Sequence, residues 1–83
     1  MNYEKQREVL KILHECHKKL LPAAFKDYLG HPNGGTFMNI LGCMTVIHGV
    51  NQKVFSDEFK DEDYENIRFV KETLESYIRP EKD

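Results

Sequence analysis

Apolar residues recur every three or four positions along most of the chain, which is the spacing of a helix face and not of a strand. No stretch alternates apolar and polar residues over the length of a strand, and no segment is repeated. The pattern therefore predicts an all-α fold, a small bundle of three to four helices. The expected helices cover residues 3 to 20, 22 to 29, 36 to 51 and 61 to 78.

The first expected helix has one apolar side built from two adjacent rows of residues. The first row contains Val9, Leu13, Cys16 and Leu20, and the second row contains Leu10, His14, His17 and Leu21. The outward positions carry mostly Lys and Glu. The helix is therefore expected to lie on the surface with one side in the core.

Two helix breakers follow in the sequence. Pro22 lacks an amide hydrogen and fits poorly inside a helix, so the first helix either kinks there or ends and restarts. We expect a restart, with Pro22 in the first turn of a short second helix. Gly30 stands where a left-handed C-terminal cap is usual. A turn then leads to Asn33 or Thr36, either of which can cap the next helix.

The third expected helix is unusual because neither of its sides carries charge. One half of its circumference is apolar and is expected to face the core. The opposite half contains only small or apolar residues: Met38, Leu41, Gly42, Thr45 and Gly49. Glycine costs up to about 1 kcal/mol relative to alanine inside a helix, so two glycines on one side suggest close approach by another backbone. The helix is expected to be central, either sandwiched within one chain or meeting the same helix of a second copy. With few helices available to surround it, we expect self-association through these five residues.

The last expected helix follows a connection in which Val54, Phe55 and Phe59 form a short helical turn. It begins at Asp61, where acidic side chains suit the positive end of the helix dipole. Its core row contains Ile67, Val70, Leu74 and Ile78. Phe69 points about opposite that row, so it is expected to be exposed.

Composition limits the chain to one small domain, residues 1 to 83. With 40% apolar and 31% charged residues it has enough apolar side chains to fold, yet a core of this size is often supplemented by self-association. The net charge is −2, and the C-terminal third is acidic. Because the chain has neither a basic stripe nor a recognisable DNA-recognition motif, specific DNA binding is not expected.

Cysteine usage and hydropathy favour a cytoplasmic protein. Cys16 and Cys43 lie in apolar helical patterns without a motif spacing, which favours free buried thiols in a reducing compartment. The first 20 residues are too charged for a signal peptide, and the apolar run from Phe37 to Val50 is too short to span a bilayer. No membrane partner is therefore expected.

The segment HECH, from His14 to His17, is the strongest candidate for metal or catalytic chemistry. The two histidines lie one turn apart, but a tetrahedral site needs further ligands from distant positions such as His31, Cys43 or His48. Neighbours one or two positions apart on a helix point in different directions, so Cys16 forms no nucleophile and base pair with either histidine. We predict no metal site, no cofactor, no catalytic residue and no enzyme activity.

The segment HPNGGTF is the expected ligand site. Its candidate residues are His31, Asn33, Gly34, Gly35, Thr36 and Phe37. Paired glycines let a backbone approach a ligand closely, and the free amides at a helix start favour an anion. No carboxylate occurs between Asp27 and Asp57. The alternative is an ordinary tight connection between antiparallel helices.

Two classes of function are consistent with these features. We expect a non-catalytic homo-oligomer that binds or sequesters an anionic, phosphate-bearing small molecule, of the nucleotide or signalling-metabolite type, near this turn. The alternative is a protein-interaction module, such as a small phage-type inhibitor or adaptor, that presents its acidic C-terminal helix and Phe69 to a protein target.

Overall fold

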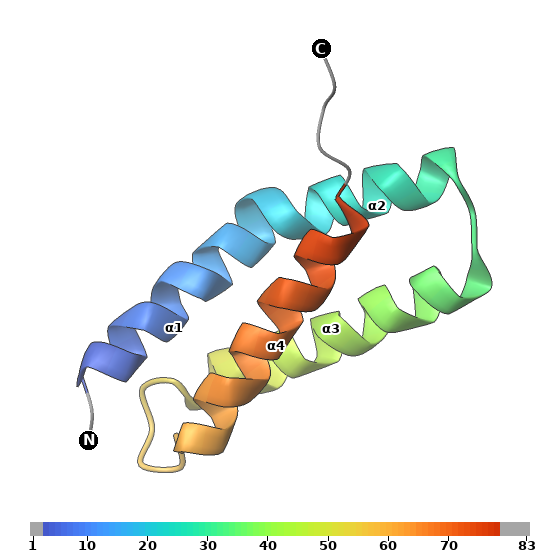
Figure 1. The fold of residues 1–83 in the computed structure, drawn as a ribbon. Coiled ribbons are helices and arrows are strands. Elements are labelled where there is room, and N and C mark those ends of the chain that lie inside the picture. The colour runs from blue at the N-terminus through green and yellow to red at the C-terminus, as the bar shows by residue number, and fades with distance from the viewer. Residues whose placement is uncertain (1–2, 79–83) are drawn as a thin grey trace.

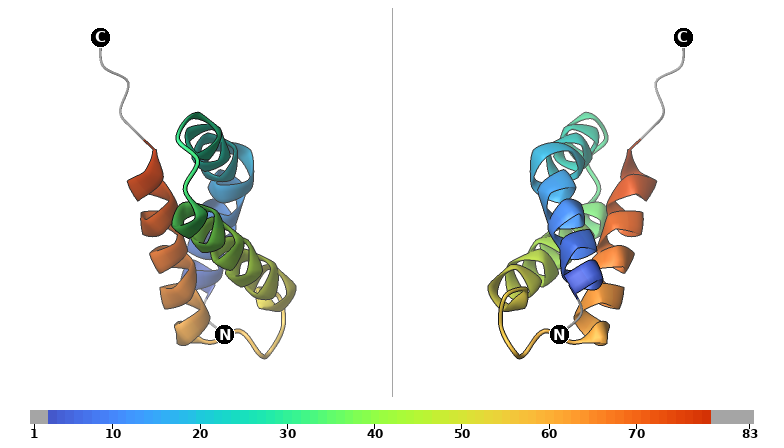
Figure 2. Two further views of the ribbon diagram at one scale, coloured as in Figure 1. Left: turned by 90° about the vertical axis from the view of Figure 1, so that its right-hand side faces the viewer. Right: turned by 90° about the vertical axis from the view of Figure 1, so that its left-hand side faces the viewer.

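The computed structural model describes residues 3–78, which form three helices without any strand (Figure 1). The first helix is long and comprises α1 (Tyr3–Glu15), the π-helical turn η1 (Cys16–Leu20) and α2 (Leu21–Gly30). α3 (Gly34–Lys53) runs back along it, and α4 (Asp61–Tyr77) packs across both, as the views from two opposite sides show (Figure 2). The all-α prediction is confirmed, with three helices.

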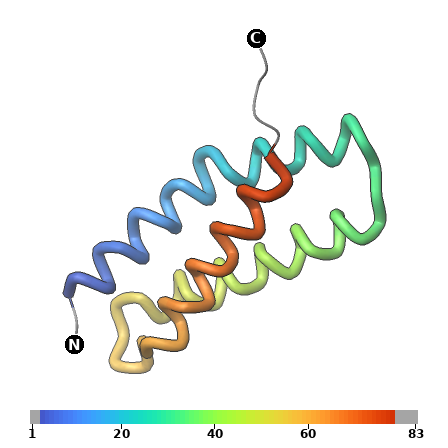
Figure 3. The backbone as a smooth tube through the Cα atoms, in the orientation of Figure 1, coloured from blue at the N-terminus to red at the C-terminus, as the bar shows by residue number. Residues whose placement is uncertain are grey.

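The first helix continues through Pro22 without a break (Figure 3). Leu20 and Leu21 keep right-handed helical backbone angles, and the Leu21 N–H donates to the Cys16 carbonyl, five residues back. A π turn widens the helix by one residue, which makes room for a proline ring that would clash with the carbonyl four residues earlier. The predicted second helix, with Pro22 in its first turn, corresponds to α2, but the expected break before it is absent because the widened turn absorbs the proline.

The end of α2 also differs from the expected cap. Gly30 belongs to the helix, and no residue of the described range has a positive φ angle. The capping residue is His31, at φ −139° and ψ 71°, whose N–H donates to the Asp27 and Tyr28 carbonyls at 3.0 and 3.2 Å. A residue before proline is disfavoured in the helical region, so Pro32 ends the helix at His31. The left-handed cap predicted at Gly30 is therefore wrong.

The connection between α3 and α4 is an irregular turn and not a helical one. Val54 is buried and Phe59 is half-buried, whereas Phe55 is 75% exposed. The Gln6 side-chain amide donates to the Val54 carbonyl at 2.7 Å, which ties the start of α1 to this turn. At the start of α4 the Lys60 N–H donates to the carboxylate of Asp63 at 3.0 Å. These contacts determine where α4 begins.

The core lies where the three helices meet and contains aliphatic side chains and both cysteines. Its largest fully buried members are Val9, Cys16, Ile40, Ile47, Val54, Ile67 and Leu74. The first predicted row of α1 is buried, but of the second row only Leu21 is buried. Leu10 is 38% exposed, and His14 and His17 are exposed. Within residues 3–78 no helix is both long and apolar enough to cross a membrane.

Candidate functional site

α3 presents an uncharged side to solvent. Its core side consists of Ile40, Cys43, Ile47 and Val50. The opposite side, here called the outer face of α3, consists of Met38, Leu41, Gly42, Thr45 and Gly49. Met38 is 65% exposed and Leu41 is 37% exposed. Since this face is open, α3 is not sandwiched within the described part of the chain, and that alternative is wrong for residues 3–78.

The two glycines of the outer face are not explained by contacts within the chain. A Cβ atom added at Gly42 or Gly49 would meet no atom within 4 Å. The Thr45 hydroxyl donates to the Leu41 carbonyl at 3.1 Å, which satisfies the hydroxyl inside the helix and lowers the polarity of the face. The outer face is therefore smooth, weakly polar and open to an approaching surface.

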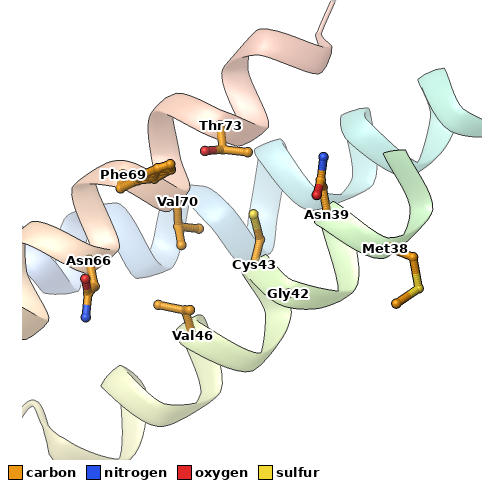
Figure 4. A pocket seen from close by; sticks show the side chains of 9 residues that line it. All are labelled: Met38, Asn39, Gly42, Cys43, Val46, Asn66, Phe69, Val70 and Thr73. Atoms are coloured by element: carbon orange, nitrogen blue, oxygen red, sulfur yellow. The ribbon is translucent and has the colours of Figure 1, made fainter. Parts of the chain in front are cut away.

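A groove of about 480 Å³ runs between α3 and α4 (Figure 4). It is lined by Met38, Asn39, Gly42, Cys43 and Val46 from α3 and by Asn66, Phe69, Val70 and Thr73 from α4. Near Asn39 its wall is held by a hydrogen bond of 2.7 Å from the Asn39 amide to the Tyr77 hydroxyl. Two residues of the outer face, Met38 and Gly42, also belong to this α3–α4 groove, so the two surfaces are continuous.

Phe69 lies at the edge of the α3–α4 groove and is 63% exposed, which confirms that it points away from the core row. Exposed carboxylates of α4 lie within two turns of Phe69, although Arg68 is exposed there as well. This acidic ridge consists of Glu62, Glu65 and Glu72. The basic residues Arg68 and Lys71 turn instead toward α1, where Lys71 pairs with Glu15 at 3.7 Å.

The turn predicted as an anion site has most of its amides already occupied. The Asn33 side-chain oxygen accepts from the Gly35 and Thr36 N–H groups at 2.8 and 3.2 Å, and the Phe37 N–H donates to the Asn33 carbonyl at 3.0 Å. Gly35 has no positive φ, and its Cβ would lie 3.2 Å from the Asn33 oxygen. Asn33 is therefore the helix cap, and an anion would have to displace its side chain to reach two of these amides.

The side chains of the turn are nevertheless accessible. His31, Asn33, Gly34 and Gly35 are exposed, Thr36 is half-buried, and the Phe37 ring packs against Tyr28 with centroids 5.4 Å apart. The structure thus brings the six predicted ligand residues together at the start of α3. Phe37 and Met38 place this turn directly beside the outer face.

The histidines and cysteines do not combine into a site. Within residues 3–78, no group of three His, Cys, Asp or Glu side chains is arranged to hold a metal ion. His17 and His48 line a small pocket of about 230 Å³ on the side of α3 away from α4, where the His48 ring lies 3.2 Å from the Gln52 amide. Burial raises the pKa of the Cys16 thiol to about 11 and also raises the pKa of Cys43. Both thiols are therefore weak nucleophiles at neutral pH.

The comparisons with known proteins do not assign a family. No protein-family model, no curated protein and no solved structure matches this chain.

The sequence pattern did not predict the α3–α4 groove or its polar residues Asn39, Asn66 and Thr73. One signal for it was present, since Asn66 and Thr73 lie one turn on either side of Phe69, where a solvated helix surface more often carries long charged side chains.

Proposed function

We propose that this chain is a non-catalytic binding protein that assembles with copies of itself through the outer face of α3. One observation carries the proposal: α3 has no charged side chain before Lys53, although one full side of it faces solvent. Helices with such a side ordinarily carry Lys or Glu there, and an apolar, uncharged surface of this extent is typical of an interface.

Small size supports the same conclusion. A chain of 83 residues buries a smaller fraction of its surface than a larger domain does, so association with a second copy supplements its core. The open space at Gly42 and Gly49 would then be explained by the neighbouring copy, which approaches a helix most closely where side chains are absent.

Sedimentation of the parent chain tests this proposal. At tens of micromolar the parent should sediment as a dimer or larger assembly, and Gly42→Leu should dissociate it. Overpacking costs about 1 to 3 kcal/mol, which corresponds to a loss of roughly 5-fold to 150-fold in affinity. A parent chain that is monomeric at this concentration would contradict the proposal.

A phosphate-bearing ligand at the turn before α3 is the second candidate function. It is favoured by the position of the turn, because exposed His31 and Asn33 lie beside the outer face and would stand at a boundary between copies. Binding of an anion there requires the Asn33 side chain to move from the Gly35 and Thr36 amides.

Thermal stability with inorganic phosphate and with a panel of mononucleotides and dinucleotides tests this second function. A ligand that prefers the folded chain raises the midpoint of unfolding by mass action. Gly35→Val should abolish the stabilisation, because a Cβ added at Gly35 lies 3.2 Å from the Asn33 oxygen, and a branched side chain would therefore crowd an anion that takes the place of that oxygen. Leu29→Val, on an exposed residue near the same turn, serves as the control. If no anion raises the midpoint, the turn serves only as a connection.

A further inference from the structure

The geometry points to a reciprocal contact between two copies, in which Phe69 of one copy enters the α3–α4 groove of the other beside Gly42. This inference rests on the proposed self-association and adds which side chain fills which space. It also joins two surfaces that the sequence presented as alternatives, the glycine side of α3 and the exposed phenylalanine of α4.

The groove offers an apolar space beside a missing side chain. Cys43, Val46 and Val70 line it, and Gly42 leaves its α3 side open, with nothing within 4 Å of an added Cβ (Figure 4). A volume of about 480 Å³ accommodates an aromatic ring from outside the chain. Aromatic side chains bury about 150 to 250 Å² each, so filling this groove with a ring removes a large apolar area from water.

Phe69 supplies the ring that such a groove needs. It is 63% exposed at the groove edge, so most of its surface has no partner within its own chain. An isologous interface requires a protrusion and its recess on one continuous surface, because the two-fold axis then satisfies both pairs at once. Phe69 and Gly42 meet that requirement, whereas an unrelated partner would need only one of the two features.

Charge favours a second copy over a like-charged surface. The acidic ridge of Glu62, Glu65 and Glu72 borders Phe69, so any partner of this region must tolerate three carboxylates. The outer face of α3 carries no charge, so a second copy brings no like charge against the ridge, and the three carboxylates stay in water at the rim of the contact. The net charge of −2 adds little repulsion between copies.

The available area suits a stable dimer. A standard interface buries about 800 Å² per partner, and the total surface of this chain is 6083 Å². A helix of 20 residues is about 30 Å long and neighbouring helices lie about 8 to 10 Å apart, so the exposed sides of α3 and α4 cover roughly 600 Å² in projection. Since accessible area exceeds projected area on a surface with protruding side chains, the two helices together reach the size required.

Sedimentation equilibrium of single variants is the first measurement. Phe69→Ala should weaken self-association at least tenfold, and Gly42→Leu should do the same by filling the recess. Phe55→Ala is the matched control, because Phe55 is an equally apolar residue, 75% exposed, in the turn between α3 and α4. It should leave self-association unchanged.

Mixing the two variants separates a contact between copies from a contact within one copy. In a mixed dimer, Phe69 of the Gly42→Leu chain meets the intact recess of the Phe69→Ala chain, while Ala meets Leu in the second pair. Native mass spectrometry of an equimolar mixture should therefore show the mixed dimer well above the statistical fraction of about one half. Phe55→Ala mixed with the parent should give the statistical fraction.

Three outcomes would overturn the inference, and they are distinguishable. A monomeric parent chain removes the proposed function together with this contact. A parent oligomer that survives Phe69→Ala leaves the proposed function standing and excludes Phe69. If both variants weaken self-association but their mixed dimer forms only at the statistical fraction, Phe69 and Gly42 are coupled inside one chain and not between copies. Within the first outcome, binding of a synthetic Leu and Lys amphipathic helix to the monomeric parent would assign the groove to a basic partner.

Discussion

The outward sides of α1 and α3 differ in chemistry although both helices complete the same core. α1 buries Val9 and Leu13 and presents charged residues such as Glu8 and Lys11 to water. α3 buries Ile40 and presents no charged side chain before Lys53, its last residue. The fold needs only the buried sides, so the uncharged exterior of α3 is not required for folding. That exterior is the surface that the proposed contact with a second copy would use.

The largest effect on stability is expected in the core, where the buried sides of α1 and α3 meet. Ile40 is fully buried, so Ile40→Ala should lower the free energy of unfolding by about 2 to 5 kcal/mol, through lost burial and a residual cavity. Guanidinium denaturation at one fixed protein concentration measures it. Leu10→Ala, at a residue 38% exposed on α1, should cost less than half as much. Equal costs would mean that the buried and outward sides are not distinct.

The next prediction concerns the two outward sides themselves. Leu10 on α1 and Leu41 on α3 are almost equally exposed, at 38% and 37%, so they form a matched pair. Leu41→Glu should weaken self-association at least tenfold, about 1.4 kcal/mol or more, because a buried carboxylate without a partner is costly. Leu10→Glu should leave the assembly unchanged. Sedimentation velocity decides, and equal behaviour of the two variants would remove the distinction between α1 and α3.

A smaller effect is expected at the start of α3. Asn33→Ala removes the acceptor of the Gly35 and Thr36 amides and should cost about 1 kcal/mol. Asn51→Ala, at an exposed position inside the same helix, should be neutral or slightly stabilising because alanine has the higher helix propensity. Thermal unfolding of both variants measures the difference. An Asn33→Ala midpoint equal to that of Asn51→Ala would show that the cap does not stabilise α3.

The smallest effect is expected on the charged exterior near the start of α1. The Lys5 ammonium lies 2.8 Å from the Asp61 carboxylate, but that carboxylate is largely exposed, so the pair is screened by water. Lys5→Ala should lower the melting temperature only slightly more than Lys11→Ala does. The difference should disappear at about 1 M salt, where the screening length is short. A large difference that persists in salt would mean that the charged exterior of α1 contributes to stability in its own right.

Local pattern was sufficient for the helices themselves. The apolar rows through Val9 and Leu13 in α1 and through Ile67 and Leu74 in α4 are buried as predicted, because a helix buries the residues that recur with its own period. The path through Pro22 was not predictable in the same way. A proline can begin a helix or be absorbed by a widened turn, and the choice depends on whether Leu20 and Leu21 before it and Ala24 after it pack into one core.

The candidate site shows the same division. The composition of the outer face of α3 was readable from the sequence, since Met38, Leu41 and Gly42 are neighbours on any helix. That this face is open, and that Phe69 of α4 lies beside Gly42 of α3, depends on how α4 crosses α3.

The sequence by itself determined that the chain is helical, where its helices lie and which side of α3 lacks charge. These properties depend on the intrinsic period of the helix and on side chains close together in the chain. The tertiary structure alone decided that α3 is uncovered on one side, that Asn33 occupies the amides of Gly35 and Thr36, and that a groove forms between α3 and α4. Those features depend on the packing of three helices against one another and on the backbone geometry of one turn, which no local spacing specifies.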